Sequence, residues 1–199
     1  MAINLTKGQT ISLKKVAPSL TRIMCGLGWD VAERPQGFLN SFRYTPEYDL
    51  DASVICLDTN DRVSKKKDVI YFGNLRHLSG AIVHLGDNLT GAGNGDDEQI
   101  IVDLPQIPST IAKLVFTVNI YSCLARKQDF SQIKNAFVRL VDMSNNQEIA
   151  RYNLSGTEYT GMTGMKMATV YRQDGSWQMK ALGEGVKVNN LEALVDSYS

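Results

Sequence analysis

Apolar and polar residues alternate along much of the chain with a period of two, in short runs that turn residues separate. This pattern is typical of strands with one buried face. The clearest run extends from Lys113 to Tyr121. Because side chains alternate along a strand, one of its faces should carry Leu114, Phe116, Val118 and Ile120, and the other Thr117, Asn119 and Tyr121.

Ten further runs have the length and composition of strands. They are Gln9–Leu13, Arg22–Leu27, Leu50–Leu57, Val69–Phe72, Ile82–Leu85, Gln99–Leu104, Phe137–Val141, Glu148–Asn153, Met165–Arg172 and Trp177–Leu182. So many strands exceed what one small flat sheet holds. The sequence therefore predicts an all-β fold, a β-sandwich of two antiparallel or mixed sheets with short peripheral helices, in one domain over residues 1–199.

Turn residues and one helix complete the predicted layout. Asp174-Gly175 indicates a tight hairpin because both residues tolerate positive φ, and Asn145-Asn146 has a similar role. After Asn189, apolar residues follow helical spacing at Leu191, Leu194, Val195 and Tyr198, with Glu192 placed for a capping-box-like start. We expect a closing C-terminal helix there, and a long irregular loop over residues 31–48.

The composition argues against several classes of protein function. Lys+Arg and Asp+Glu balance at 21 each, which gives no global attraction to nucleic acid. No transmembrane segment and no secretory signal is visible in the sequence, so a cytoplasmic protein is expected. Cys25, Cys56 and Cys123 form neither a disulfide framework nor a zinc motif, and buried thiols are expected.

The most unusual segment reads GDNLTGAGNGDDE and spans residues 86–98. It combines glycines that allow tight backbone turns with four carboxylates, Asp87, Asp96, Asp97 and Glu98, and no basic residue. Calcium prefers six to eight oxygen ligands of this kind. Two carboxylates about 5 Å apart repel by roughly 3 kcal/mol at an effective dielectric near 20, and a divalent cation would reverse that repulsion.

Two other kinds of binding loop do not fit this segment. A phosphate-binding loop needs a lysine or a Gly-x-Gly-x-x-Gly pattern, and the alternating Gly91, Gly93 and Gly95 provide neither. An EF-hand counted from Asp87 would place Leu89 at a ligand position. A solvated acidic hairpin loop remains open, since Asp and Gly are ordinary turn residues.

A second acidic group lies at Asp49 and Asp51, which should point to one face at the start of a strand. Asp30 ends the preceding strand, so a hairpin would bring it to the same end of the sheet as Asp49. Asn74 would return there after the strand that begins at Val69. A surface-exposed polar face is the alternative interpretation.

Five segments are similar to the TerD family of tellurite-resistance and stress proteins: GLGWD (26–30), YDLDAS (48–53), the acidic segment (86–98), KNAFVRLVD (134–142) and EIARYNL (148–154). They occur in family order along nearly the whole chain. The resemblance implies a β-sandwich with a pair of calcium ions and no established catalytic activity. It implies ligands from Asp49, Asn74, Asp87, Asn88, Asp96, Asp97 and Glu98, with Asp30 and Asp51 as weaker candidates.

The leading functional hypothesis is thus a calcium-binding stress-response protein that presents a metal-organised surface to protein partners whose identity the sequence does not give. A nucleotide or cyclic-nucleotide binder is the first alternative, and a metal-dependent hydrolase the second. We expect no enzyme, because no Gly-x-Ser-x-Gly elbow or Cys-His pairing is visible. His77 and His84 lack the neighbours of a zinc site and are expected to be structural or surface histidines.

Overall fold

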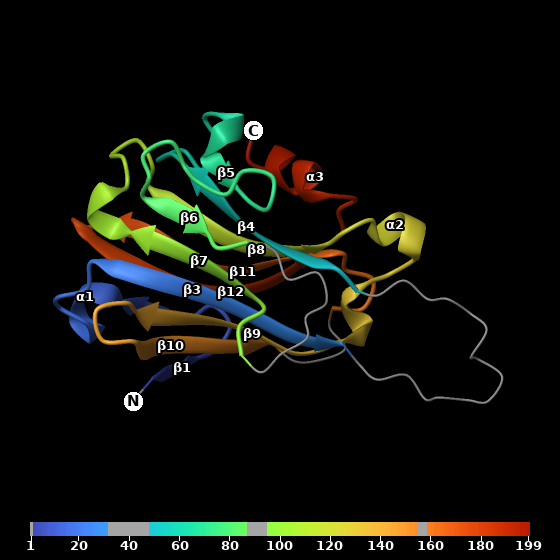
Figure 1. The fold of residues 1–199 in the computed structure, drawn as a ribbon, viewed down its shortest axis with the longest axis horizontal. Coiled ribbons are helices and arrows are strands. Elements are labelled where there is room, and N and C mark those ends of the chain that lie inside the picture. The colour runs from blue at the N-terminus through green and yellow to red at the C-terminus, as the bar shows by residue number, and fades with distance from the viewer. Residues whose placement is uncertain (1, 32–47, 87–94, 155–158) are drawn as a thin grey trace.

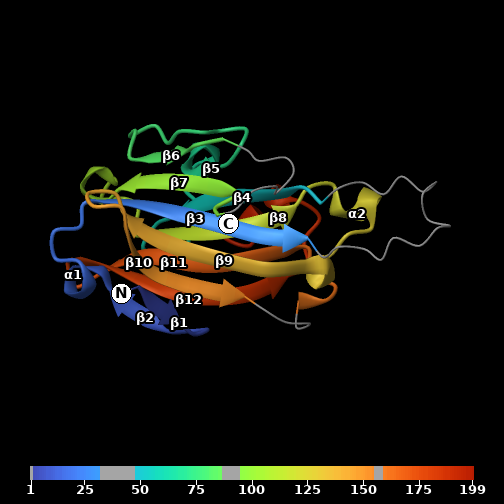
Figure 2. The same ribbon diagram turned by 60° about the horizontal axis from the view of Figure 1, so that its bottom comes forward.

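The protein is a sandwich of two six-stranded sheets, as the two views of the ribbon show (Figures 1 and 2). The computed structural model describes residues 2–31, 48–86, 95–154 and 159–199. The first sheet has the strand order β1-β10-β9-β3-β7-β6, and the second has the order β2-β12-β11-β8-β4-β5. The predicted all-β sandwich is confirmed.

The strands of the first sheet are β1 (Ile3–Leu5), β3 (Arg22–Val31), β6 (Ile82–His84), β7 (Glu98–Asp103), β9 (Ile133–Asp142) and β10 (Gln147–Leu154). Those of the second are β2 (Thr10–Ser12), β4 (Leu50–Leu57), β5 (Val69–Ile70), β8 (Lys113–Ile120), β11 (Gly164–Gln173) and β12 (Ser176–Val186). Three short α-helices are described, α1 (Leu13–Val16), α2 (Cys123–Arg126) and α3 (Leu191–Asp196). Three 3₁₀ turns lie at Lys66–Asp68, Leu104–Gln106 and Phe130–Gln132.

The core lies between the sheets and follows the alternation of the sequence. On β8, Leu114, Phe116, Val118 and Ile120 are at most 1% exposed and belong to this core. Thr117 and Asn119 point to the opposite face of the same strand, as predicted, yet they too are buried. The reason is α3, which packs through Leu194 on the outer face of the second sheet.

The predicted turns and helix are observed with one adjustment. Asp174 and Gly175 have φ of 49° and 70° and close the β11–β12 hairpin. The C-terminal helix is capped by Asn190, whose side chain accepts a hydrogen bond from the Ala193 backbone N–H, rather than starting directly after Asn189. This cap satisfies one of the N-terminal amides of the helix.

Strand β1 is the element that the sequence analysis missed. It has only three residues and pairs in parallel with β10, from Ile3 with Ala150 to Leu5 with Tyr152, so the first sheet is mixed. The three cysteines are buried and unbridged as expected. Within the described residues, no helix has the length and apolar character to cross a membrane. Most of the expected loop over residues 31–48 lies outside the described residues.

Candidate functional site

The C-terminal part of the acidic segment, Gly95 to Glu98, lies against the C-terminal half of β3. Gly26 and Gly28 make this approach possible. A Cβ atom on Gly28 would lie 2.7 Å from the Gly95 carbonyl oxygen, and one on Gly26 would overlap the Asp96 carboxylate. The two glycines of the GLGWD segment thus provide the space into which the acidic segment folds.

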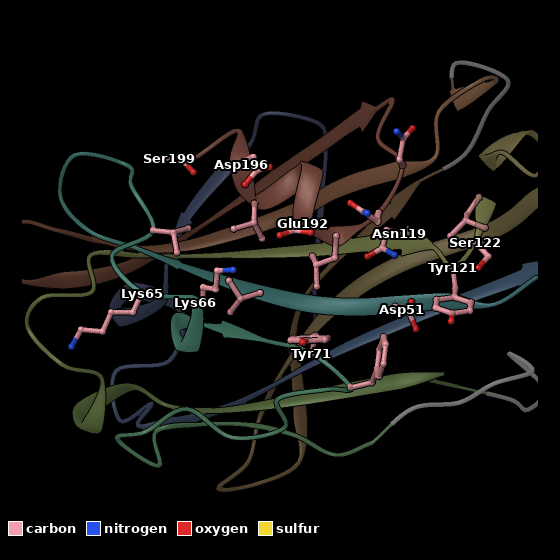
Figure 3. A pocket seen from close by; sticks show the side chains of 18 of the residues that line it. Asp51, Lys65, Lys66, Tyr71, Asn119, Tyr121, Ser122, Glu192, Asp196 and Ser199 are labelled. Carbon is pink, nitrogen blue, oxygen red and sulfur yellow. The ribbon is translucent and has the colours of Figure 1, made fainter. Parts of the chain in front are cut away.

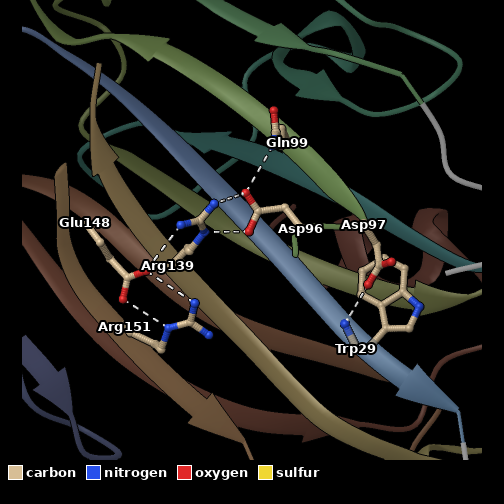
Figure 4. A network of polar contacts seen from close by, with 7 residues as sticks. All are labelled: Trp29, Asp96, Asp97, Gln99, Arg139, Glu148 and Arg151. Carbon is tan, nitrogen blue, oxygen red and sulfur yellow. Dashed lines mark hydrogen bonds and ion pairs between the residues drawn. The ribbon is translucent and has the colours of Figure 1, made fainter. Parts of the chain in front are cut away.

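Asp96, just before β7, is neutralised by an arginine of β9, the strand on the other side of β3 (Figure 4). Arg139 on β9 donates from Nε to Asp96 Oδ1 at 2.6 Å and from Nη2 to Oδ2 at 2.9 Å. Its guanidinium also reaches Glu148, which pairs with Arg151. The hydrogen bonds to Asp96 raise the pKa of Arg139 above its ordinary value. A bidentate pair of this kind already occupies both oxygens of Asp96.

Asp97 has a different environment. Its backbone N–H donates to Leu27 O at 2.8 Å, and its Oδ2 accepts from the Trp29 backbone N–H at 2.7 Å. Burial, with the negative charges of Asp30 and Asp96, raises the pKa of Asp97 against the opposing effect of the Trp29 hydrogen bond. A raised carboxyl pKa means that the ionised form is disfavoured, and a bound cation would relieve this.

Asp30 lies near the end of β3, and its negative charge raises the pKa of Asp97. It is exposed, and its Oδ2 accepts a hydrogen bond from Asn135 Nδ2 at 2.8 Å. The sequence favours the residues of the acidic segment over Asp30 as ligands. In the structure, it is a carboxylate that acts directly on Asp97.

Glu98 points away from Asp97 into the space between the sheets, where it is 2% exposed. Its Oε2 accepts from the Ala52 backbone N–H of β4 at 2.8 Å and lies 3.1 Å from His84 Nε2. Because His84 Nδ1 accepts from the Gly86 N–H, we assign the ring hydrogen to Nε2, which donates to Glu98. The predicted ligand Glu98 therefore joins the two sheets, and His84 is structural as expected.

Three other predicted ligands have separate surroundings. Asp49 Oδ2 lies 3.5 Å from Arg126 Nη1. Asp51 is on β4 opposite Asn119, and it lines a groove on the outer face of the second sheet. Asn74 donates from Nδ2 to the Val69 carbonyl at 2.7 Å, which fixes the β5 turn. The charges that raise the pKa of Asp97 are those of Asp30 and Asp96, and not those of Asp49 or Asp51.

Asp87 and Asn88 lie outside the described residues. Over the part of the chain that is described, no group of three or more His, Cys, Asp or Glu side chains is arranged to hold a metal ion. The carboxylates brought together are Asp30, Asp96 and Asp97. The pairings of Asp96 with Arg139 and of Glu98 with His84 were missed, because neither has a signal in local sequence spacing.

Comparisons with known proteins agree with the fold. The model of the TerD domain matches residues 1–198. The chain is 48% identical over 200 residues to stress response protein SCP2 of Bacillus subtilis (strain 168), with all of both chains covered. It is 40% identical over 185 residues to tellurium resistance protein TerD of Serratia marcescens, which covers 93% of this chain and 91% of the relative.

A solved structure is also similar. It is described as a homologue of the telluride resistance protein (TerD) from Streptomyces coelicolor A3(2), and it superposes with a TM-score of 0.68. The match covers 91% of this chain and 99% of that one at 20% identity. At this identity the likeness establishes the sandwich fold.

Proposed function

The chain belongs to the TerD family, and on that premise we propose that it is a calcium-binding stress-response protein, with the ion held at the Asp97 end of β3. The observation that carries the proposal is the state of Asp97. Its carboxylate is half-buried and lies near the charges of Asp30 and Asp96, and both effects raise its pKa. A divalent cation stabilises such a group in its ionised form.

The donor set suits a hard cation. Carboxylate oxygens of Asp97 and Asp30, with backbone carbonyls of a glycine-rich segment, are the ligand types that calcium prefers. Asp96 adds negative potential, although Arg139 holds both of its oxygens. Asp87 and Asn88, which precede this segment in the sequence, stay predicted ligands, as does the second ion.

Bound calcium would act on the surface that partners meet. It would neutralise the repulsion between Asp30 and Asp97 and fix the acidic segment against Gly26 and Gly28. We therefore propose that the protein functions as an interaction module in the cytoplasm, organised by the ion and without catalysis of its own. The salt-bridged row from Asp96 to Arg151 lies beside this end and gives it a defined pattern of charge.

A calorimetric titration tests the proposal. We expect saturable calcium binding to the parent protein and weaker magnesium binding at matched ionic strength, because magnesium demands near-ideal octahedral geometry. Asp97→Asn should weaken calcium binding at least about tenfold, equivalent to about 1.4 kcal/mol. Asp174→Asn is the matched control, since it removes one exposed aspartate charge in the β11–β12 turn.

Two results would count against the proposal. The absence of binding heat when millimolar calcium is added to the parent protein would contradict calcium binding. Equal affinities of the parent and Asp97→Asn would place the ion elsewhere.

A further inference from the structure

A groove of about 780 Å³ lies on the outer face of the second sheet (Figure 3). Strands β4 and β8 form its floor through Asp51 and Asn119, while Tyr71 and Phe72 beyond β5 line one side and Glu192 of α3 the other. The volume suits a small organic molecule. We call this cavity the outer groove.

The floor of the outer groove is polar and includes one buried amide oxygen without a hydrogen-bond partner in the described part of the chain. Asp51 and Asn119 are cross-strand partners and are 5% and 4% exposed. Asn119 Oδ1 is buried and has no hydrogen-bond partner among the described residues. An unsatisfied buried polar group costs about 1–3 kcal/mol, so the Asn119 carbonyl oxygen favours an occupant that donates a hydrogen bond.

Aromatic rings lie beside this floor. Tyr71 and Phe72 pack edge to face with their ring centroids 5.2 Å apart, and Phe72 and Tyr121 do so at 6.5 Å. Phe72 and Tyr121 remain 44% and 46% exposed. The guanidinium of Arg126 already lies 5.4 Å from the Tyr121 ring centroid. Rings placed in this way attract organic cations through their negative faces.

The two ends of the groove carry side chains of opposite charge. Figure 3 shows Asp51, Asn119 and Tyr121 together, with Lys65 and Lys66 toward the opposite end. Glu192 lies between them on α3. An anionic head group beside Asp51 would meet a buried carboxylate in a low-dielectric setting, which is unfavourable, whereas a cation with N–H donors would be stabilised.

We propose that the outer groove binds a small organic cation with several N–H donors, a primary amine or a guanidinium compound. Its head group lies between Asp51 and Asn119, donates to their oxygens and contacts the rings of Phe72 and Tyr121. This site is separate from the calcium site and does not depend on it, since Asp51 and Asn119 belong to β4 and β8 of the second sheet, whereas Asp30 and Asp97 lie on β3 and just before β7 of the first.

The test is a calorimetric titration with agmatine in the presence of a calcium chelator, on the full chain. We expect saturable binding to the parent protein. Asp51→Asn should weaken it at least about tenfold, and Tyr121→Leu should weaken it by a smaller factor. Asp174→Asn, whose residue lies in the β11–β12 turn, should bind as the parent does. Melting curves show whether each variant is folded. If Asp51→Asn does not fold, the agmatine affinity of Tyr121→Leu tests the proposal.

Arginine and adenosine monophosphate define the chemistry further. Arginine adds a carboxylate to the same guanidinium, so binding comparable to that of agmatine would support the assigned head-group position. No saturable agmatine binding up to about 10 mM would overturn the proposal, because it would leave only water on the polar floor. Unchanged agmatine affinity in both groove variants, or binding of adenosine monophosphate without agmatine binding, would overturn it too.

Discussion

Asp97 combines a hydrogen-bonded carboxylate with a pKa above its ordinary value, and the balance of these effects leads to a prediction. Asp97→Asn keeps the acceptor for the Trp29 N–H and removes the charge that Asp30 and Asp96 repel. In chelator, the variant should therefore unfold at a higher temperature than the parent. The measurement is a pair of melting curves at neutral pH.

The sign of the pH dependence follows from the same pKa. In the folded parent, Asp97 holds its proton to a higher pH than in the unfolded chain, whose pKa is near 3.8. The parent therefore loses stability as the pH rises from that value through the folded pKa. The advantage of Asp97→Asn should grow over this window and then stay constant, whereas a difference independent of pH would contradict the assignment.

Glu98 should behave in the opposite way. Its carboxylate accepts from Ala52 and His84 in the interior, so Glu98→Gln weakens charge-assisted hydrogen bonds between the sheets. We expect a loss of about 1–3 kcal/mol of unfolding free energy, equal in calcium and in chelator. Denaturant unfolding under both conditions measures it. An unchanged apo stability together with lost calcium binding would instead assign Glu98 to the metal, as the sequence alone suggested.

At the scale of single residues, the sequence indicated which acidic residues are unusual, but not which groups they contact. Asp96, Asp97 and Glu98 are adjacent in sequence, yet they face an arginine, a strand backbone and the core, respectively. Arg139 and Asp96 are 43 positions apart, and their contact depends on the register of β3 against β9 and β7. Local spacing carries no record of such register, so these contacts required the structure.

At the scale of elements, α3 offers a direct prediction. The Asn190 side chain satisfies the Ala193 N–H, so Asn190→Ala should cost about 1 kcal/mol of unfolding free energy. For a chain of this size, that corresponds to a fall of roughly 2–4 °C in Tm. Asn189→Ala is the control, since its exposed side chain makes no hydrogen bond to the described residues. A larger loss for the control would contradict the observed cap.

The strands were predictable where alternation was long and turns were marked. β4 and β8 match their predicted runs within one residue, because each buries one face in the core and ends at turn residues. β1 was missed since three residues show too little alternation, and its parallel partners on β10 are 147 positions away in the chain, as Ile3 and Ala150 are. The burial of Thr117 and Asn119 was also unforeseen, because it depends on α3 packing over their face.

At the scale of the whole molecule, the sandwich separates two candidate sites. The acidic end belongs to the first sheet, through β3 and β7, and the outer groove to the second, through β4 and β8. Asp49 and Asp51 resemble calcium ligands in sequence, but Asp51 is on the groove side. Calcium and an organic cation should therefore bind without direct competition.

Thermal unfolding of the parent protein with millimolar calcium and with chelator tests the central claim most directly. A ligand at a hundred times its dissociation constant adds about 2.7 kcal/mol to the unfolding free energy. We expect Tm to rise by roughly 5–10 °C in calcium, and by clearly less in Asp97→Asn. Superimposable melting curves of the parent in calcium and in chelator would contradict calcium binding, and the full rise in Asp97→Asn would contradict the site.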